Sequence, residues 1–116
     1  MRVLIVDDHR SFRVSARQLL EAEGFAVVGE ACDGRQAIAA AERLEPDLIL
    51  LDVQLPDLDG FEVAARIAAS GSRAAVVLTS SRALHEYGSL VAESAARGFI
   101  PKEELSGATL TALVAP

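Results

Sequence analysis

The sequence predicts an α/β protein of the (βα)5 type, a three-layer sandwich in which helices cover both faces of a five-stranded parallel sheet. Short apolar runs alternate with amphipathic stretches along all 116 residues. The run at residues 48–51 is apolar at every position, as in a strand that is covered on both sides. Strict alternation of this kind indicates parallel strands joined by right-handed crossover helices.

The first strand is expected at residues 3–6, where an apolar run rich in β-branched residues is stopped by two aspartates. Apolar residues then recur at i, i+4, i+7 and i+8, which is one stripe of a helix. These residues are Phe12, Ala16, Leu19 and Leu20. A second strand is expected at residues 25–28. Asp33 is the expected N-cap of the second helix, with Gln36 completing a capping box, and this helix ends before Pro46.

The rest of the chain repeats this alternation of strand and helix. Residues 48–51 form the expected third strand, and a turn-rich loop at residues 55–60 leads into a third helix that a glycine closes. A fourth strand is expected at residues 74–78, a fourth helix over about residues 84–96 and a fifth strand at residues 98–100. A short last helix follows, with Ser106 as its expected cap. Its apolar residues are Leu105, Leu110, Leu113 and Val114.

The composition indicates one compact domain spanning residues 1–116, because 51% of the residues are hydrophobic and 24% are charged. A net charge of −6 without a basic run argues against direct binding of nucleic acid. No apolar stretch approaches the roughly 20 residues that a membrane helix needs. The single cysteine, Cys32, suits a reducing compartment. We therefore expect a cytoplasmic protein that does not insert into a membrane.

Polar side chains follow four of the five expected strands at their carboxyl ends. They are Asp7, Asp8, Asp52, Thr79 and Lys102, the only lysine in the chain. Taken singly, each has an ordinary explanation as a helix cap or a surface charge. Open parallel sheets bind ligands outside the carboxyl ends of their strands, however, so these side chains are expected to converge in one crevice.

Three crowded carboxylates repel one another, and a close pair costs on the order of several kcal/mol near a protein surface. Such a cluster indicates a bound cation, and carboxylate ligands favour Mg²⁺ over zinc. His9 and His85 are the only histidines, and nothing pairs either of them with Cys32 in a zinc site. A carboxylate also acts as a nucleophile toward phosphorus, while a cation, a lysine and a hydroxyl neutralise the transferred group. These residues and a bound cation supply the groups needed to transfer a phosphoryl group onto Asp52.

Five segments in this order resemble the receiver domain of bacterial two-component response regulators, along essentially the whole chain. They are residues 3–9 (VLIVDDH), 46–52 (PDLILLD), 55–60 (LPDLDG), 79–80 (TS), and the pair Phe99 and Lys102. Residues 7–13 further resemble receivers that are attached to LuxR-type transcription factors. The resemblance implies a flavodoxin-like fold with the sheet order 2-1-3-4-5.

The resemblance also implies the phosphoacceptor and the metal ligands. Asp52 is the implied phosphoacceptor. The implied cofactor is Mg²⁺, for which Mn²⁺ can substitute. Its implied ligands are the carboxylates of Asp8 and Asp52 and the backbone carbonyl of Gln54, with Asp7 acting through a water molecule.

The other implied roles concern the phosphoryl group once it is attached. Thr79 and Lys102 are the implied phosphate contacts. Thr79 and Phe99 are the implied switch pair, which moves as the Thr hydroxyl approaches the phosphate. Gln54 and Ser81 occupy the positions that tune dephosphorylation in this family.

The implied function is a phosphorylation-dependent signalling switch rather than a turnover enzyme. The implied partners are a sensor histidine kinase or phosphotransfer protein, and an output domain or effector protein. The face formed by the fourth helix, the fifth strand and the last helix would change its packing on phosphorylation, and it is also the expected surface for a homodimer. No DNA-binding helices follow these elements within the sequence, so we expect a stand-alone receiver or the receiver part of a longer regulator.

The main alternative is a degenerate receiver that acts as an interaction module without phosphorylation. Ser80 stands where the family often has Ala or Gly, and Pro101 precedes Lys102 where a Pro usually follows it. Neither departure removes a chemical group. A flavin- or nucleotide-binding domain is disfavoured because it would need a phosphate-binding glycine loop after the first strand. An aspartyl phosphatase is disfavoured because it would need a second acid near Asp52 and a cap over its substrate.

Overall fold

The computed structural model describes residues 1–114, in which strands and helices alternate along the chain. The strands are β1 (Arg2–Val6), β2 (Ala26–Ala31), β3 (Leu48–Asp52), β4 (Ala75–Ser80) and β5 (Gly98–Pro101). The helices are α1 (Arg10–Ala22), α2 (Gly34–Leu44), α3 (Gly60–Ala69), α4 (Leu90–Glu93) and α5 (Gly107–Val114).

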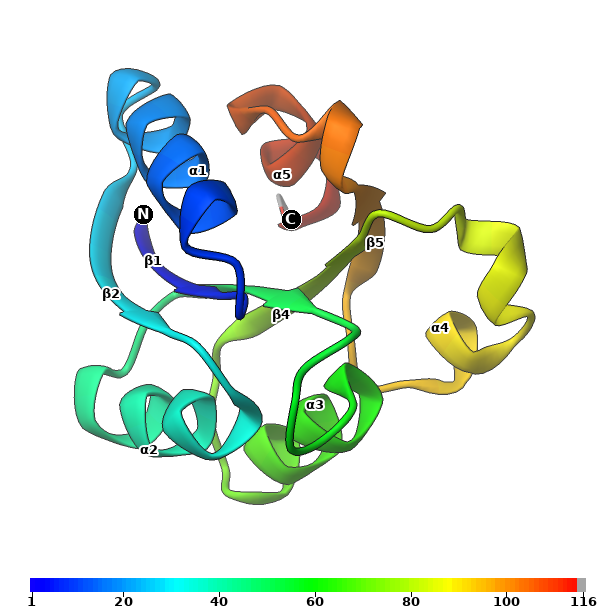
Figure 1. Cartoon of the computed structure of the whole chain (residues 1–116). Helices are drawn as coiled ribbons and strands as arrows, with labels where there is room; N and C mark the ends of the chain where they lie inside the picture. The colour runs from blue at the N-terminus through cyan, green and yellow to red at the C-terminus, as the bar shows by residue number, and fades with distance from the viewer. Residues whose placement is uncertain (115–116) are drawn as a thin grey trace.

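The five strands form one parallel sheet in the order β2-β1-β3-β4-β5. Helices α1 and α5 cover one face of the sheet and α2 and α3 cover the other, while α4 lies near the edge formed by β5 (Figure 1). The fold class and the strand order expected from the sequence are therefore confirmed. This order brings the carboxyl ends of β1, β3 and β4 next to one another.

The hydrophobic core has two halves, one on each face of the sheet. Alternate residues of β1 supply them: Val3 and Ile5 pack under α1 and α5, while Leu4 and Val6 pack under α2 and α3. All five residues of β3 are buried, which explains why its sequence lacks the alternation of a half-exposed strand. The core thus fixes the strand whose last residue is Asp52.

Side-chain caps define where three helices begin. Asp33 accepts a hydrogen bond from the backbone N–H of Gln36 at 2.8 Å, so the predicted N-cap is confirmed. The Gln36 side chain bonds to the backbone N–H of Cys32 instead of that of Asp33, so it does not complete a capping box. Ser106 accepts from the backbone N–H of Thr109 at 3.0 Å, as expected for the cap of α5. Asp59 caps α3 in the same way.

The continuous helix predicted over residues 84–96 is wrong. The structure has a 3₁₀ turn, η1 (Leu84–Tyr87), followed by the four-residue α4. Gly88 interrupts the segment with a φ of 59°, a left-handed conformation that a continuing helix cannot contain. At the end of α4, the Ser94 hydroxyl donates a hydrogen bond to the carbonyl of Val91.

Several strand boundaries also differ from the expectation. Strand β2 runs on to Ala31, and β4 includes both Thr79 and Ser80 because each continues its pairing with a neighbouring strand. Lys102 begins a 3₁₀ turn, η2 (Lys102–Glu104), and residues 1–114 contain no cis peptide bond. Within the same residues, no helix is long and apolar enough to cross a membrane.

Candidate functional site

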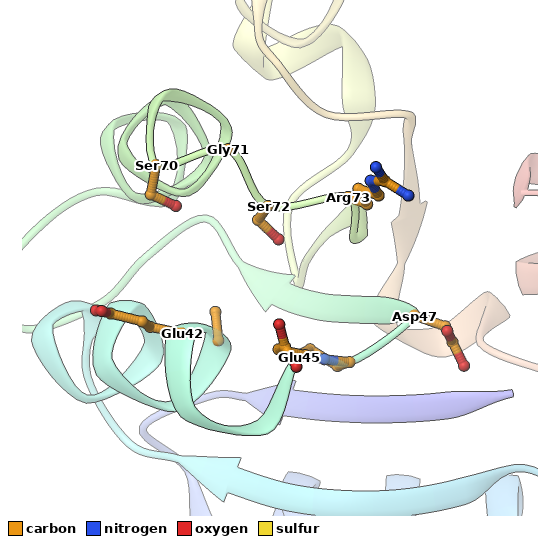
Figure 2. A pocket seen from close by; sticks show the side chains of 9 residues that line it. Glu42, Glu45, Asp47, Ser70, Gly71, Ser72 and Arg73 are labelled. Atoms are coloured by element: carbon orange, nitrogen blue, oxygen red, sulfur yellow. The ribbon is translucent and has the colours of Figure 1, made fainter.

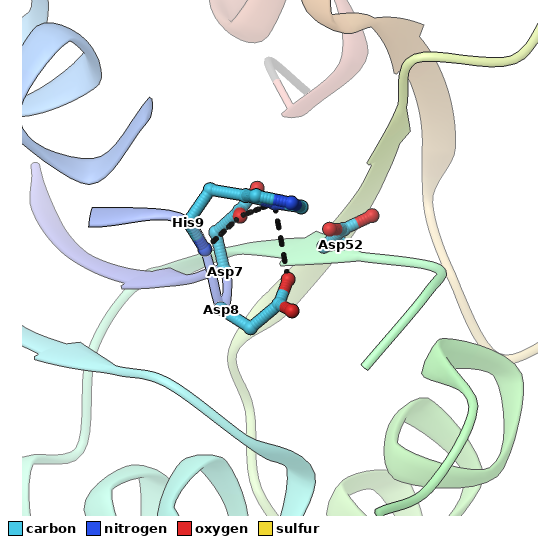
Figure 3. Close-up of side chains that lie close together, drawn as sticks. All are labelled: Asp7, Asp8, His9 and Asp52. Carbon is cyan, nitrogen blue, oxygen red and sulfur yellow. Dashed lines mark hydrogen bonds and ion pairs between the residues drawn. The ribbon is translucent and has the colours of Figure 1, made fainter. Parts of the chain in front are cut away.

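The carboxyl ends of β1 and β3 bring together the three predicted aspartates and one histidine. Asp7 and Asp8 follow β1 directly, and Asp52 is the last residue of β3 (Figure 3). One potential ligand atom each from Asp7, Asp8, His9 and Asp52 lies within 4.8 Å of the others. The three aspartates therefore converge, as their places after parallel strands predict.

Asp52 is held in place by the sheet and by two donors. Its register partner on β4 is Thr79. The backbone N–H of Gln54 donates to Asp52 Oδ1 at 3.1 Å, and Lys102 Nζ lies 3.3 Å from Asp52 Oδ2. Only 3% of Asp52 is exposed, so the carboxylate has a fixed orientation in a largely dry environment.

Lys102 lies between two buried carboxylates. Its Nζ is 2.7 Å from Asp7 Oδ2, and it also lies 4.7 Å from the centre of the Phe12 ring, a cation–π distance. Burial lowers the pKa of Lys102, but the contact with Asp7 and the charges of Asp52 and Asp7 outweigh burial and leave the pKa above its ordinary value. The only lysine of the chain is therefore a cation at this site.

The buried carboxylate of Asp52 is easier to protonate than an exposed one. Burial raises its pKa, and the charge of Asp7 raises it further. The hydrogen bond from Gln54 and the charge of Lys102 oppose these effects, and the balance moves the pKa from 3.8 to about 6. Burial and the charge of Asp7 together thus outweigh the stabilisation that Gln54 and Lys102 give to the ionised form of Asp52.

His9 belongs to the cluster, although sequence reasoning gave it no role there. Its Nδ1 lies 3.0 Å from Asp7 Oδ1 and 3.1 Å from Asp8 Oδ1, as the dashed lines in Figure 3 show. The ring itself remains exposed. Its position directly after the two aspartates is the only signal that pointed to it.

Thr79 and Ser80 end β4 with their hydroxyls in different environments. Thr79 is fully buried, and its Oγ1 has no hydrogen-bond partner among residues 1–114. Ser80 Oγ is 2.6 Å from the Tyr87 hydroxyl and accepts from the backbone N–H of Arg82 at 3.0 Å. Tyr87 in turn lies against Phe99, with 5.7 Å between the ring centres.

The remaining predicted residues lie around the crevice rather than within it. Phe99 is half-buried on β5 and packs against the core on the α2–α3 face. Gln54 and Ser81 are exposed. The Gln54 side-chain oxygen, in the orientation that matches its donors, accepts from Nε and Nη2 of Arg82, each at 3.3 Å.

The donor set fits a hard divalent cation. The converging atoms are mainly carboxylate oxygens, two from nearly inaccessible side chains, and oxygen ligands are what Mg²⁺ and Mn²⁺ prefer. The unpartnered hydroxyl of Thr79 and the ammonium of Lys102 add one neutral and one positive hydrogen-bond donor. Together with a bound cation, these two donors could offset part of the charge of an anionic group placed on Asp52.

Several solved structures similar to this chain are receiver domains. The signal receiver domain of the response regulator NarL from Mycobacterium tuberculosis aligns with a TM-score of 0.86 and 32% identity, covering 99% of this chain and 97% of that one. A CheY in a complex with CheX, BeF3 and Mg²⁺ from Borrelia burgdorferi aligns with a TM-score of 0.85 and 27% identity, covering 98% of this chain and 86% of that one.

BvgA of Bordetella pertussis, described as a positive transcription regulator of virulence factors, is 37% identical over 103 residues, which is 89% of this chain and 49% of BvgA. The chain thus spans about half the length of the curated relatives it matches. The response regulator receiver domain family matches residues 3–115. The chain therefore belongs to the response regulator receiver domains, the phosphoacceptor modules of two-component signalling.

Proposed function

We propose that this domain accepts a phosphoryl group on Asp52 from a histidine kinase or a phosphotransfer protein, with Mg²⁺ as cofactor. The observation that carries the proposal is the arrangement around Asp52. Its buried carboxylate lies 3.3 Å from the ammonium of the only lysine, and it shares a cluster with two further aspartates. This arrangement supplies a nucleophile together with the positive charge that phosphoryl transfer needs.

The proposed step exchanges one bond to phosphorus for another. A carboxylate oxygen of Asp52 attacks the phosphorus of the donor phosphohistidine and forms an acyl phosphate. The bond between phosphorus and the imidazole nitrogen breaks, and its electron pair stays on the imidazole, which takes up a proton from solvent. Lys102 Nζ orients Asp52 beforehand and then faces the new phosphoryl oxygens.

Four groups would hold Mg²⁺: the carboxylates of Asp8 and Asp52, the backbone carbonyl of Gln54, and Asp7 through a water molecule. When bound, the cation neutralises charge on the carboxylates and on the phosphoryl oxygens. His9 would have to leave its position between Asp7 and Asp8 if those two carboxylates turned toward the cation. Mn²⁺ presents similar charge and ligand preference and would substitute.

Thr79 and Phe99 form the proposed switch. The Thr79 hydroxyl is buried without a partner among residues 1–114, so a phosphoryl oxygen would offer it an acceptor. Movement of Thr79 would also displace Ser80, whose hydroxyl bonds to Tyr87, and Tyr87 lies against Phe99. A change at Asp52 would thus reach the surface formed by α4, β5 and α5, where an output domain, an effector or a second copy would bind.

Gln54 and Ser81 would tune how long the phosphoryl group persists. Both side chains are exposed, and Arg82 pairs with the Gln54 side chain. A cytoplasmic location, where Cys32 stays reduced, is part of the same proposal. The alternative of a degenerate receiver is less well supported, since Thr79 is the register partner of Asp52 and Lys102 lies 3.3 Å from it.

The decisive experiment measures intact mass after incubation with acetyl phosphate, with and without Mg²⁺. We expect one Mg²⁺-dependent phosphoryl adduct on the wild type and none on Asp52→Asn. Asp47→Asn, which changes an exposed aspartate at the opposite end of the sheet, should still be phosphorylated. A folded wild-type protein that gains no adduct from acetyl phosphate or phosphoramidate would establish the degenerate receiver instead.

A further inference from the structure

A groove runs between α3 and the segment formed by η1 and α4. It consists of two adjoining cavities of about 550 and 340 Å³, which share Asp59, Phe61 and Leu90 as lining residues. The helix α4, which contributes Leu90 and Glu93 to the groove, has only four residues where the sequence predicted a continuous helix. Leu90, in α4, leaves 52% of its surface exposed at this groove.

The floor of the groove is apolar. The rings of Phe61 and Tyr87 meet edge to face with 5.8 Å between their centres, and both are only partly buried. Leu55 and Leu58 extend this surface along the first cavity. Together with Leu90 they offer several adjacent apolar side chains, which is more than the scattered exposure that single surface leucines provide.

The rim of the groove is acidic. Asp57, Asp59, Glu62 and Glu93 line the two cavities, and no lysine or arginine lines either of them. Backbone N–H groups, that of Gly34 first, hold the pKa of Asp57 below its ordinary value, so this carboxylate stays ionised. Glu62 pairs with Arg66 on the outer side of α3, and Arg82 lies against Gln54 at the end near Asp52. The other carboxylates form no ion pair among the described residues.

We propose that this groove docks a basic amphipathic helix of a partner protein. Apolar anchors of such a helix would contact Phe61, Tyr87 and Leu90, and its lysines or arginines would face the acidic rim. Charge complementarity selects this occupant, because a neutral or acidic segment would leave the rim unpaired or place like charges together. A second copy of this chain fits poorly, since its net charge is −6.

The groove also adjoins the proposed switch. The Tyr87 hydroxyl on the floor is 2.6 Å from Ser80 Oγ, and Ser80 follows Thr79, the register partner of Asp52. A docked helix would therefore contact the aromatic ring that a phosphoryl group is proposed to move. Docking itself does not need phosphorylation, and only its regulation rests on the proposed function.

The test is a titration of the ¹⁵N-labelled protein with a peptide of about 12 residues that has leucines at i, i+3, i+4 and i+7 and lysines elsewhere. We expect saturable amide shifts at Phe61, Tyr87 and Leu90. Leu90→Ser should weaken binding about tenfold, and the double variant Glu62→Lys, Glu93→Lys should do the same. Leu84→Ser is the matched control, because Leu84 is similarly exposed, at 49%, but lines neither cavity.

Four outcomes would overturn the proposal: no saturable shift, shifts confined to another face, equal binding of a peptide with glutamate in place of lysine, or full affinity in Leu90→Ser. The exposed position of Leu90 makes loss of folding an unconvincing explanation, and the amide spectrum of each variant checks it. The titration omits Mg²⁺ and phosphodonor, so its failure is distinct from a failure of Asp52 to accept a phosphoryl group.

Discussion

The two ends of the sheet hold their charged residues in opposite ways. At the amino end, the Arg2 guanidinium donates to the carbonyls of Leu44 and Glu45, each at 2.7 Å, where α2 ends. The backbone N–H of Arg2 donates to Asp47 at 2.8 Å. These contacts satisfy the last carbonyls of a helix with a cation, which stabilises the fold. The carboxyl end instead buries more negative charge than its lysine neutralises.

The number of acidic residues does not distinguish the two ends, but their burial does. A cavity of about 530 Å³ at the amino end is lined by Glu42, Glu45 and Asp47 together with Arg73 (Figure 2). All three carboxylates there are exposed. Asp7 and Asp52 at the carboxyl end are buried, so only this end carries a desolvation cost. A buried charge that lowers stability is typical of a functional site, so burial agrees with the function proposed for the carboxyl end.

Two glycines give the largest expected difference between the ends. A Cβ on Gly60 would lie 2.6 Å from the backbone oxygen of Asp52 and 2.7 Å from Val53 Cα, and backbone atoms cannot yield easily. Gly60→Ala should therefore lower the free energy of unfolding by about 3 kcal/mol and disturb the loop after Asp52. Denaturant unfolding measures the first effect, and phosphorylation by acetyl phosphate measures the second.

Gly71→Ala is the matched variant at the amino end. A Cβ there meets no atom within 4 Å, but Gly71 has a φ of 85°. Only backbone strain applies, and we expect a loss of about 1 kcal/mol with phosphorylation unchanged. Equal destabilisation by both variants would show that the close approach at Gly60 is not tight.

Asp52→Asn should make the protein more stable at pH 7 without Mg²⁺. The pKa of Asp52 rises from 3.8 in the unfolded chain to about 6 in the folded one, so the folded state disfavours the ionised form. This shift corresponds to roughly 3 kcal/mol. We expect a gain of about 2 kcal/mol, because Lys102 loses one of its two carboxylate partners in the variant.

The sign of the effect sets its dependence on pH. Because the pKa is raised on folding, the wild type is not penalised below about pH 4, loses stability between about pH 4 and 6, and bears the full penalty above pH 6. The gain of Asp52→Asn over the wild type should follow the same course in urea unfolding. A gain that stays constant from pH 4 to 7 would contradict the raised pKa.

At the amino end, Arg2→Ala should act in the opposite direction and by less. It removes two hydrogen bonds to the last carbonyls of α2, which are exposed, so we expect a loss of about 1 kcal/mol. Arg10→Ala, which changes another exposed arginine in the first turn of α1, is the control and should have little effect. Phosphorylation of Asp52 should not respond to either variant.

The sequence could predict the convergence of the site because topology alone produces it. Once the strands are parallel and ordered 2-1-3-4-5, residues after β1, β3 and β4 must lie together. The position of the His9 ring was not predictable, because it depends on a side-chain rotamer and not on periodicity. The Ser80–Tyr87 hydrogen bond was not predictable either. Tyr87 lies in a 3₁₀ turn that ends before Gly88, whereas the apolar pattern predicts a continuous helix there.

The smallest expected effect on stability is that of removing the Thr79 hydroxyl, which contrasts with removing the neighbouring Ser80 hydroxyl on β4. Thr79→Val replaces a buried hydroxyl that has no partner among residues 1–114 by an apolar group of the same shape. The free energy of unfolding should therefore stay the same or rise by up to about 1 kcal/mol, whereas Ser80→Ala loses contacts to Tyr87 and Arg82 and should lower it by about 1 kcal/mol. Since Thr79 is also the proposed phosphate contact, the valine variant should accept less phosphoryl group while remaining as stable as the wild type. A clear loss of stability in Thr79→Val would mean that the hydroxyl already serves the resting fold, and that it is not held in reserve for the phosphoryl group.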